Sequence, residues 1–396
     1  MNNEFQRARP PVLHEWLFII AIGLLSFNLH ASITATDPLL RMIGQSLGIS
    51  MEWSDPFSWM PIGFLALAAL LAPRLVKSFP MWKIALIAQI VGLCGIFWRC
   101  SDGATGLFGG LILNGLGLGL AGCIVPGLIK KHFSVRPQIY MGFYSAMIDL
   151  GMMMATAVTL PIALTYGSWR LGLGIWSIPL VLGIIVWVIY FRFFRIPDRD
   201  ELVPNRFAQI IKQKIGWDLT FLYAVRVGKS YLFAAWIAIL LQGRGFVESD
   251  AKFIMAMSIL AQIPSSLFAN YVAQTMGGAG RLIATCSVIT AITSWLIFYT
   301  PNYWTLPLAM VLGFCSGAVF SRGLGLMLEH AGNTSSAICL SGMVQGFGYC
   351  IGAGGAFLLG QLIDPQGNFW IFCLIYTILT AFSIMYGLIC GRPGKV

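Results

Sequence analysis

The stretch WDLTFLYAVRVGKSYLFAAWIAILL, residues 217–241, decides the class of this protein. It is long and apolar enough to cross a bilayer as one helix, yet Arg226 and Lys229 stand near its middle. The two residues are three positions apart, so a helix places them on one face. A charge at membrane depth is costly unless it is paired or hydrated. The rest of the chain must therefore provide a protein interior or an aqueous cavity for these two cations.

The composition of the whole chain supports this interpretation. Of its 396 residues, 58% are hydrophobic and 10% are charged, whereas soluble domains are about 25% charged. Apolar runs of roughly twenty residues recur from end to end, and each is a candidate transmembrane helix. We therefore predict an all-α polytopic membrane protein with twelve spans, near 16–38, 56–76, 82–100, 105–129, 138–165, 171–194, 217–242, 251–274, 282–300, 304–328, 335–361 and 368–390.

The basic residues between the predicted spans indicate the topology. With the first residues inside, 17 Lys and Arg fall on the cytoplasmic side and 5 on the opposite side, the latter being Arg41, Arg99, Arg170, Arg244 and Lys252. This asymmetry follows the positive-inside rule. We expect a protein of the cell inner membrane with both termini cytoplasmic. The net charge of +10 is then a topology signal and does not indicate nucleic-acid binding.

A polar stretch divides the chain into two halves. RIPDRDELVPNRFAQIIKQK, residues 195–214, lies between the sixth and seventh predicted spans. Its prolines and mixed charges are typical of a linker with a short amphipathic piece. We predict a six-helix bundle at 1–194, a cytoplasmic linker at 195–216 and a second six-helix bundle at 217–396.

The two halves also resemble each other in sequence. Five residues of the fourth span recur in the tenth at a constant offset of 198, namely Gly115, Gly119, Gly127, Leu128 and His132 against Gly313, Gly317, Gly325, Leu326 and His330. Duplicated halves with a binding site between them at mid-membrane are typical of secondary transporters. Small residues such as these also allow helices to approach closely in lipid.

Several motifs resemble one known family. They are NLHASITATDPLL (28–40), LNGLGLGLAGCIVPGLIKKHF (113–133), MGFYSAM (141–147), GFCSGAVFSRGLGLMLEH (313–330) and MVQGFGYCIGAG (343–354). Together with twelve spans in two halves, they resemble the cyanate and nitroimidazole porter family of the major facilitator superfamily. The chain departs from the family pattern at His30, where the family has arginine, and at Ala31, where it has proline. The resemblance implies a transporter whose first and seventh spans line a central cavity.

Five inner residues are the candidates for substrate binding or coupling. His30 on span one and Arg226 and Lys229 on span seven can reach one mid-membrane chamber, Arg322 lies toward the cytoplasmic part of span ten, and Asp149 lies near the middle of span five. Three fixed cations against one carboxylate favour an anionic substrate. Guanidinium offers a fork that fits carboxylates. We therefore expect a small organic anion, most simply a carboxylate, as the substrate.

Each of these residues also has a structural alternative. Arg226 or Lys229 can lock a helix interface by pairing with Asp149, and Arg322 can belong to an intracellular gate or extend to the cytoplasmic interface. Asp149 is either a partner of one cation or a protonatable coupling site. His30 has the ordinary pKa that suits proton coupling, and a hydrogen-bonded structural role is equally compatible.

Other polar and aromatic residues complete the candidate list. Asn28, Tyr144, Tyr223 and Gln345 are expected to contact substrate. Asp37 and Arg99, near the outer ends of spans one and three, are expected to gate an outer vestibule. Further aromatic side chains that can wall the cavity are Trp59, Trp236 and Tyr349.

No enzyme signature is present in the sequence. The chain has no GxxxxGK[ST] phosphate loop, and GLGLGLAG (115–122) lies inside a span and follows no strand. We expect no metal, no cofactor and no enzymatic activity. The leading hypothesis is a monomeric secondary transporter that moves a small organic anion through the lipid bilayer by alternating access, with protons as the coupling ion. The alternative is an exporter of drugs or of neutral or amphipathic metabolites, and a membrane sensor without transport is a distant third.

Overall fold

A computed structural model describes residues 13–48, 54–101, 103–133, 136–193, 207–363 and 369–392. In the first half of the chain its helices are α1 (Leu13–Thr34), η1 (Asp37–Leu39), α2 (Leu40–Leu47), α3 (Ser54–Leu75), α4 (Met81–Arg99), α5 (Gly103–His132), α6 (Pro137–Thr165), α7 (Trp169–Gly174) and α8 (Ser177–Phe193). In the second half they are α9 (Phe207–Ile210), α10 (Lys214–Gly243), α11 (Glu248–Thr275), α12 (Ala279–Tyr299), η3 (Asn302–Trp304), α13 (Thr305–His330), α14 (Thr334–Gly360) and α15 (Phe369–Cys390).

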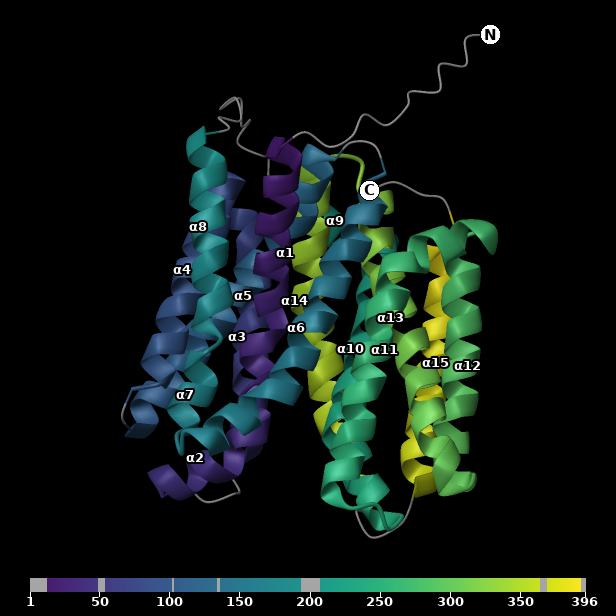
Figure 1. The fold of residues 1–396 in the computed structure, drawn as a ribbon. Helices are drawn as coiled ribbons and strands as arrows, with labels where there is room; N and C mark the ends of the chain where they lie inside the picture. Colours follow the sequence, from purple (N-terminus) through teal and green to yellow (C-terminus); the bar gives the residue numbers. More distant parts are fainter. Residues whose placement is uncertain are drawn as a thin grey trace.

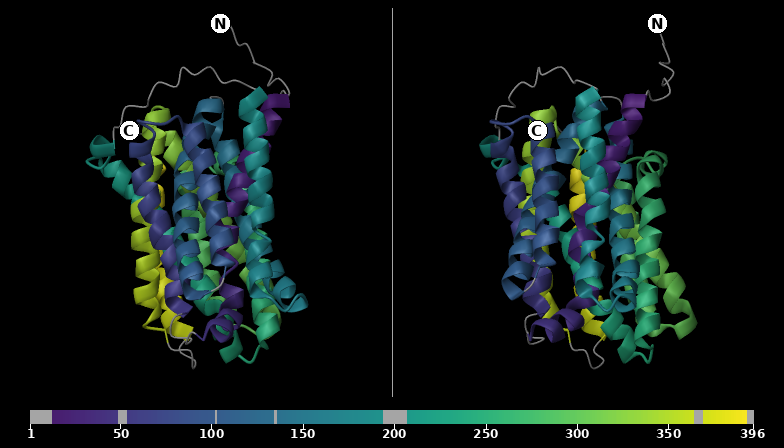
Figure 2. Two further views of the ribbon diagram at one scale, coloured as in Figure 1. Left: turned by 90° about the vertical axis from the view of Figure 1, so that its left-hand side faces the viewer. Right: turned by 60° about the vertical axis from the view of Figure 1, so that its left-hand side comes forward.

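The long helices run roughly parallel to one another and form a bundle that is several helices deep in each of the three views of Figures 1 and 2. Helix α1 starts, and α15 ends, at the end of the bundle drawn at the top of Figure 1. The same end carries Arg74, Lys130, Arg136 and Lys214 at or beside helix termini, and we call it the basic end. The opposite end holds α2 and the turn between α10 and α11.

The predicted all-α polytopic membrane fold is confirmed. Eleven described segments are long and apolar enough to cross a membrane, and the described apolar part of α3 is the shorter Trp59–Leu75. Large apolar side chains also face outward, with Phe97 59%, Phe268 61% and Leu358 69% exposed. Such an outer surface suits hydrocarbon, because an all-helical chain satisfies its own backbone hydrogen bonds there.

Two predicted spans are interrupted. The first, predicted at 16–38, ends as a helix at Thr34 and continues through η1 into α2, because Pro38 cannot donate a backbone hydrogen bond and disfavours helix at Asp37. The sixth, predicted at 171–194, is divided into α7 and α8 around Ile175. Pro179 lacks the N–H that would bond the carbonyl four residues earlier, at Ile175.

Two pairs of the repeated glycines have matching packing roles. A Cβ on Gly115 would overlap the carbonyl oxygen of Pro61, and one on Gly119 that of Leu65, so α5 lies directly against α3. Gly313 and Gly317 in α13 meet the carbonyl oxygens of Ser258 and Gln262 in α11 in the same way. Because the contacted carbonyls are also four residues apart in each case, the second contact reproduces the geometry of the first. This equivalence supports the internal repeat that the sequence predicts.

Contacts between the two halves involve a small set of helices. Helix α14 packs against α3 and α5, and α6 packs against α11 and α13. Within each half, the closest pairs include α4 with α5 and α12 with α15. Of the predicted linker, residues 195–206 lie outside the described residues, and α10 begins at Lys214, three positions before the predicted boundary. Helices α3, α5 and α6 of the first half and α11, α13 and α14 of the second therefore form the interface between the halves.

Candidate functional site

The centre of the bundle contains a hydrogen-bonded chain of three side chains from three helices. Nε2 of His30, on α1, lies 3.0 Å from the Tyr349 hydroxyl on α14. The hydroxyl of Tyr223, on α10, donates to the Tyr349 hydroxyl at 3.0 Å. Both tyrosines are buried, with 5% and 6% of their surface exposed. This chain joins the first half of the protein to the second at the predicted mid-membrane level.

A second polar contact crosses the same interface. The Gln345 amide, on α14, donates to the Gly122 carbonyl on α5 at 3.0 Å and to the Ser341 hydroxyl at 2.8 Å. The Tyr144 hydroxyl lies 3.5 Å from the same Gly122 carbonyl. His30, Tyr144, Tyr223, Gln345 and Tyr349 all line one central cavity of ≈10 Å³. That volume is about the space of one water molecule, so the central site is closed.

Arg226 lies beside this cavity and behind an aromatic wall. It lines a second cavity of ≈10 Å³ with Gly323 and other α10 and α13 residues. Its guanidinium carbon stands 3.8 Å from the centroid of the Phe320 ring, a close cation–π contact. Phe320 and Tyr223 line both cavities and separate them. Nε of Arg226 is buried without a hydrogen-bond partner among the described residues.

Asp149 is fully buried on α6 and faces the second half of the protein. Its Oδ2 accepts a hydrogen bond of 2.7 Å from the Ser266 hydroxyl on α11, and its Oδ1 has no partner among the described residues. Arg226 interacts electrostatically with both Asp149 and His30. In the described part of the chain no salt bridge joins Asp149 to Arg226. The positive charge of Arg226 therefore acts on both Asp149 and His30, and no described carboxylate contacts Arg226 directly.

Lys229 does not line either central cavity, which differs from the prediction of one shared chamber. Its Nζ lies 5.9 Å from the Tyr376 ring on α15, and it interacts electrostatically with Arg226 first, and then with Cys315 on α13 and Cys286 on α12. One helical turn beyond Arg226 is enough to direct this side chain into the interior of the second half. The residue is 5% exposed.

Arg322 is also separate from the central site. Its Nη2 donates to Glu329 Oε1 at 2.9 Å in a salt bridge, and its Nη1 donates to Asn270 Oδ1. It lines a different, larger cavity at the basic end. The prediction counted three inner cations and one carboxylate, Asp149. It missed Glu329, which pairs with Arg322. Of the two inner cations that no described carboxylate contacts, Arg226 lines a central cavity and Lys229 does not.

The remaining predicted residues lie away from the two central cavities. Asn28 is fully buried and donates to the Leu24 carbonyl of its own helix at 3.1 Å. Arg99 is fully buried rather than exposed in a vestibule, and donates to the Ser32 carbonyl of α1. Asp37 is exposed at the opposite end. Trp236 packs beside Gly360.

Both ends of the central site are covered. At the basic end the Lys130 ammonium on α5 donates to the carbonyl oxygens of Leu328, at 2.7 Å, and Ala331. On the other side Trp59 of α3 packs against Tyr231 and Phe357, each with ring centroids 5.6 Å apart. The basic end is thus closed by polar bonds between the halves, and the opposite side by aromatic contacts.

Sequence reasoning missed two residues of this arrangement. Phe320 was one of many apolar residues in α13, and no pattern distinguished it. Ser266 follows another serine in a polar segment of α11, where its hydroxyl could equally bond its own helix. Only the packing of α11 against α6 directs it to Asp149.

The profile of the Major Facilitator Superfamily matches residues 100–353, more than half of the chain. The chain belongs to the Major Facilitator Superfamily. Three relatives span nearly all of it. An uncharacterized transporter of Bacillus subtilis, YycB, is 24% identical over 92% of this chain and 90% of its own length. The 2-nitroimidazole transporter of Escherichia coli is 24% identical over 96% of each chain. The cyanate transport protein CynX of Escherichia coli is 23% identical over 89% of this chain and 91% of its own.

Membership of the superfamily establishes a membrane transporter rather than an enzyme. The predicted resemblance to cyanate and nitroimidazole porters is confirmed at the level of the family. The central location of His30, Tyr223, Arg226 and Tyr349 on α1, α10 and α14 agrees with a transporter whose two halves meet at the substrate.

Proposed function

We propose that the protein is a secondary active transporter for a small organic anion, most simply a carboxylate. The observation that carries this proposal is Arg226. It is partly buried among largely apolar residues of α10 and α13, its Nε has no hydrogen-bond partner among the described residues, and no described salt bridge neutralises it. A cation in such surroundings is stabilised by an anion that brings two acceptor oxygens to the guanidinium fork.

The names of the relatives are compatible with this substrate class. Cyanate is a small anion, and a cyanate transport protein is similar to this chain along most of its length. The second relative carries 2-nitroimidazole, a flat ring with nitro oxygens. A site with one guanidinium and several tyrosines accommodates either chemistry, so the two relatives alone do not choose between them. The unneutralised charge of Arg226 is what favours the anion.

Alternating access in this proposal depends on the two closures and on Phe320. Separation of Lys130 from Leu328 would open the basic end, and separation of Trp59 from Tyr231 would open the other. Displacement of the Phe320 ring would join the two central cavities and expose the Arg226 fork to the substrate. The structure is then the closed intermediate of the cycle.

Proton coupling is proposed for Asp149, with His30 as a second candidate. Asp149 is a buried carboxyl within the electrostatic reach of Arg226, so an anion on Arg226 and a proton on Asp149 compensate each other's charge. His30 reaches Tyr223 through Tyr349. A coupled proton would thus be held close to the substrate charge that it balances.

The proposed topology has the basic end in the cytoplasm. The excess of Lys and Arg at this end follows the positive-inside rule. Both termini would be cytoplasmic, the membrane the cell inner membrane, and the functional unit one chain with bundles at 1–194 and 217–396. Each bundle would move as a body around the central site.

The alternative is export of neutral or amphipathic compounds. It is favoured by the aromatic lining of Tyr144, Tyr223, Phe320 and Tyr349 and by the relative that carries 2-nitroimidazole. In that case Arg226 would serve as a gate residue, and transport would not depend on the charge of the substrate.

Uptake measured with the unmodified protein and with matched Arg226 variants distinguishes the two proposals. Purified protein in liposomes is assayed with acetate, cyanate and 2-nitroimidazole, and compared with Arg226→Gln and Arg226→Lys. We expect anion uptake to fall roughly tenfold to a hundredfold in Arg226→Gln, because a charge-assisted bond contributes about 1.5–3 kcal/mol, with partial recovery in Arg226→Lys. Arg281→Gln, an exposed residue at the basic end, is the control. Unchanged anion uptake in folded Arg226→Gln would overturn the proposal, and loss of nitroimidazole transport only would favour the alternative.

A further inference from the structure

A wide cavity lies at the basic end and shares no residue with the central site. Its volume is ≈720 Å³, within the range of pockets that bind small molecules. The ends of α11, α13 and α15 and the start of α12 surround it, with Gln138 of α6 on the side of the first half. The central cavities, by contrast, are about the size of one water molecule.

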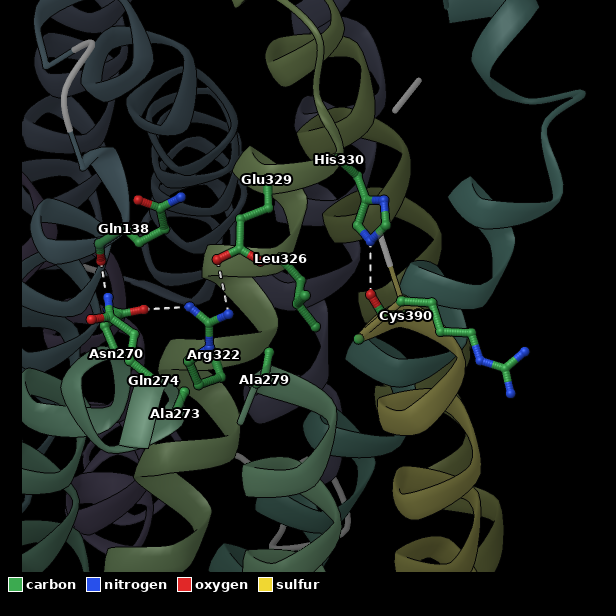
Figure 3. Close-up of a pocket in the computed structure, with 13 residues that line it drawn as sticks. Gln138, Asn270, Ala273, Gln274, Ala279, Arg322, Leu326, Glu329, His330 and Cys390 are labelled. Carbon is green, nitrogen blue, oxygen red and sulfur yellow. Dashed lines mark hydrogen bonds and ion pairs between the residues drawn. The ribbon is translucent and has the colours of Figure 1, made fainter. Parts of the chain in front are cut away.

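The charged groups of this cavity are unevenly buried. The Arg322 side chain is 6% exposed, whereas its partner Glu329 is 34% exposed. Glu329 can therefore turn to solvent at little cost, and Arg322 cannot. Arg392 adds a second positive charge to the lining. Figure 3 shows Arg322 between Asn270 and Glu329, with a bond to each. The cavity thus holds a fixed cation whose acidic partner is exchangeable.

A histidine at the edge of the cavity joins α13 to the end of α15. Nε2 of His330 is 2.7 Å from the Cys390 carbonyl oxygen, to which it donates, so Nδ1 of the neutral ring is an acceptor. Nδ1 is buried without a partner among the described residues. The lining therefore offers an anion the guanidinium groups of Arg322 and Arg392, whereas His330 Nδ1 is not accessible from the cavity. A phosphate group carries up to two negative charges and several acceptor oxygens, so it matches two guanidinium groups more fully than a carboxylate with its single charge.

We propose that this cavity is a second, regulatory site for a phosphate group, distinct from the transport site, in which the phosphate displaces Glu329 from Arg322. The site is joined to the closure between the halves. Arg322 Nη1 donates to Asn270 Oδ1, and Asn270 Nδ2 donates to the Gln138 carbonyl at 2.6 Å. Two hydrogen bonds therefore connect Arg322 to Gln138 of the first half. A phosphate bound at Arg322 would act through them on the contact between α11 and α6.

The phosphate can come from solution or from the headgroup of an anionic lipid, and one experiment distinguishes the two. The full chain in phosphatidylcholine nanodiscs is titrated with inorganic phosphate, and in parallel phosphatidylglycerol replaces part of the lipid. The readout is the thermal unfolding midpoint, which rises when a ligand binds the folded state. Stabilisation by dissolved phosphate identifies a soluble ligand, and stabilisation by phosphatidylglycerol alone identifies a lipid.

Two substitutions predict opposite shifts. Arg322→Gln should weaken phosphate binding roughly tenfold or more, because it removes a charge-assisted bond. Glu329→Gln should strengthen it, because it removes the competing carboxylate. If the salt bridge between Arg322 and Glu329 is purely structural, neither substitution strengthens phosphate binding. Arg226→Gln should leave phosphate binding unchanged, which separates this site from the transport site. If Arg322→Gln does not fold, Glu329→Gln decides alone. Absence of stabilisation in both arms, or weaker binding in Glu329→Gln, would overturn the proposal.

Discussion

The guanidinium of Arg226 lies 3.8 Å from the centre of the Phe320 ring, which is 3% exposed and forms part of the wall between the two small central cavities. The charge and the ring come from different helices of the second half, α10 and α13. Phe320 therefore stabilises the cation through a cation–π contact and stands between Arg226 and the cavity that His30 lines.

Phe320→Ala should change selectivity more than turnover. Removal of the ring merges the two cavities and forfeits a desolvated cation–π contact of about 2 kcal/mol. We expect longer carboxylates to compete better with acetate in uptake assays, together with a lower unfolding midpoint. Phe320→Tyr keeps the ring and serves as the control. A selectivity series identical to that of the unmodified protein would show that the ring does not border the substrate.

Lys229→Met should stabilise the protein and leave transport intact. The lysine is 5% exposed and lies beside Tyr376, Cys286 and Cys315, and replacement of buried ionic groups by apolar ones of similar volume can stabilise by about 1–4 kcal/mol. Lys252→Met, which breaks an exposed pair with Glu248, should change stability by less than about 1 kcal/mol. Both are measured by thermal unfolding and liposome uptake. Loss of uptake in folded Lys229→Met would place Lys229 on the substrate path.

Asp149→Asn should uncouple transport from the proton gradient. Asparagine retains an oxygen that accepts from the Ser266 hydroxyl but cannot exchange a proton. We expect accumulation driven by a pH gradient to be lost, while exchange of labelled for unlabelled substrate continues. Ser266→Ala, which retains the carboxyl, should still accumulate substrate. Gradient-driven accumulation in Asp149→Asn would transfer the coupling role to another group, of which His30 is the nearest candidate.

Gly313→Ala should destabilise the second half. The added Cβ would overlap the Ser258 backbone carbonyl, and overpacking of this kind typically costs about 1–3 kcal/mol. Gly323, on the same helix, has open space at its Cβ position, so Gly323→Ala should be neutral or slightly stabilising, because alanine is the better helix former. Thermal unfolding of the two variants measures the difference. Equal midpoints would mean that α11 and α13 can separate without loss of stability.

Most of the architecture was predictable because a bilayer allows few solutions. Helices must be long and apolar, and eleven described segments meet this condition. The interruptions at residues 35–39 and 175–176 follow from Pro38 and Pro179, although the apolar runs themselves continued across them. The site was less predictable, because the direction of a side chain depends on which neighbour fills the adjacent space. Arg226 and Lys229 share a helical face in the sequence, but in the structure Arg226 contacts the Phe320 ring and lines a central cavity, whereas Lys229 lies near the Tyr376 ring.

The sequence by itself determined the membrane class, the recurring glycine spacing, and the place of Arg226 within an apolar span, because hydropathy and residue spacing are local properties of the chain. Only the tertiary structure decided which cations are neutralised. Glu329 reaches Arg322 within α13, Ser266 reaches Asp149 across the two halves, and Phe320 covers Arg226. Charge compensation depends on distances of a few ångströms in three dimensions, and residues 117 positions apart, such as Asp149 and Ser266, acquire such a distance only when the helices pack.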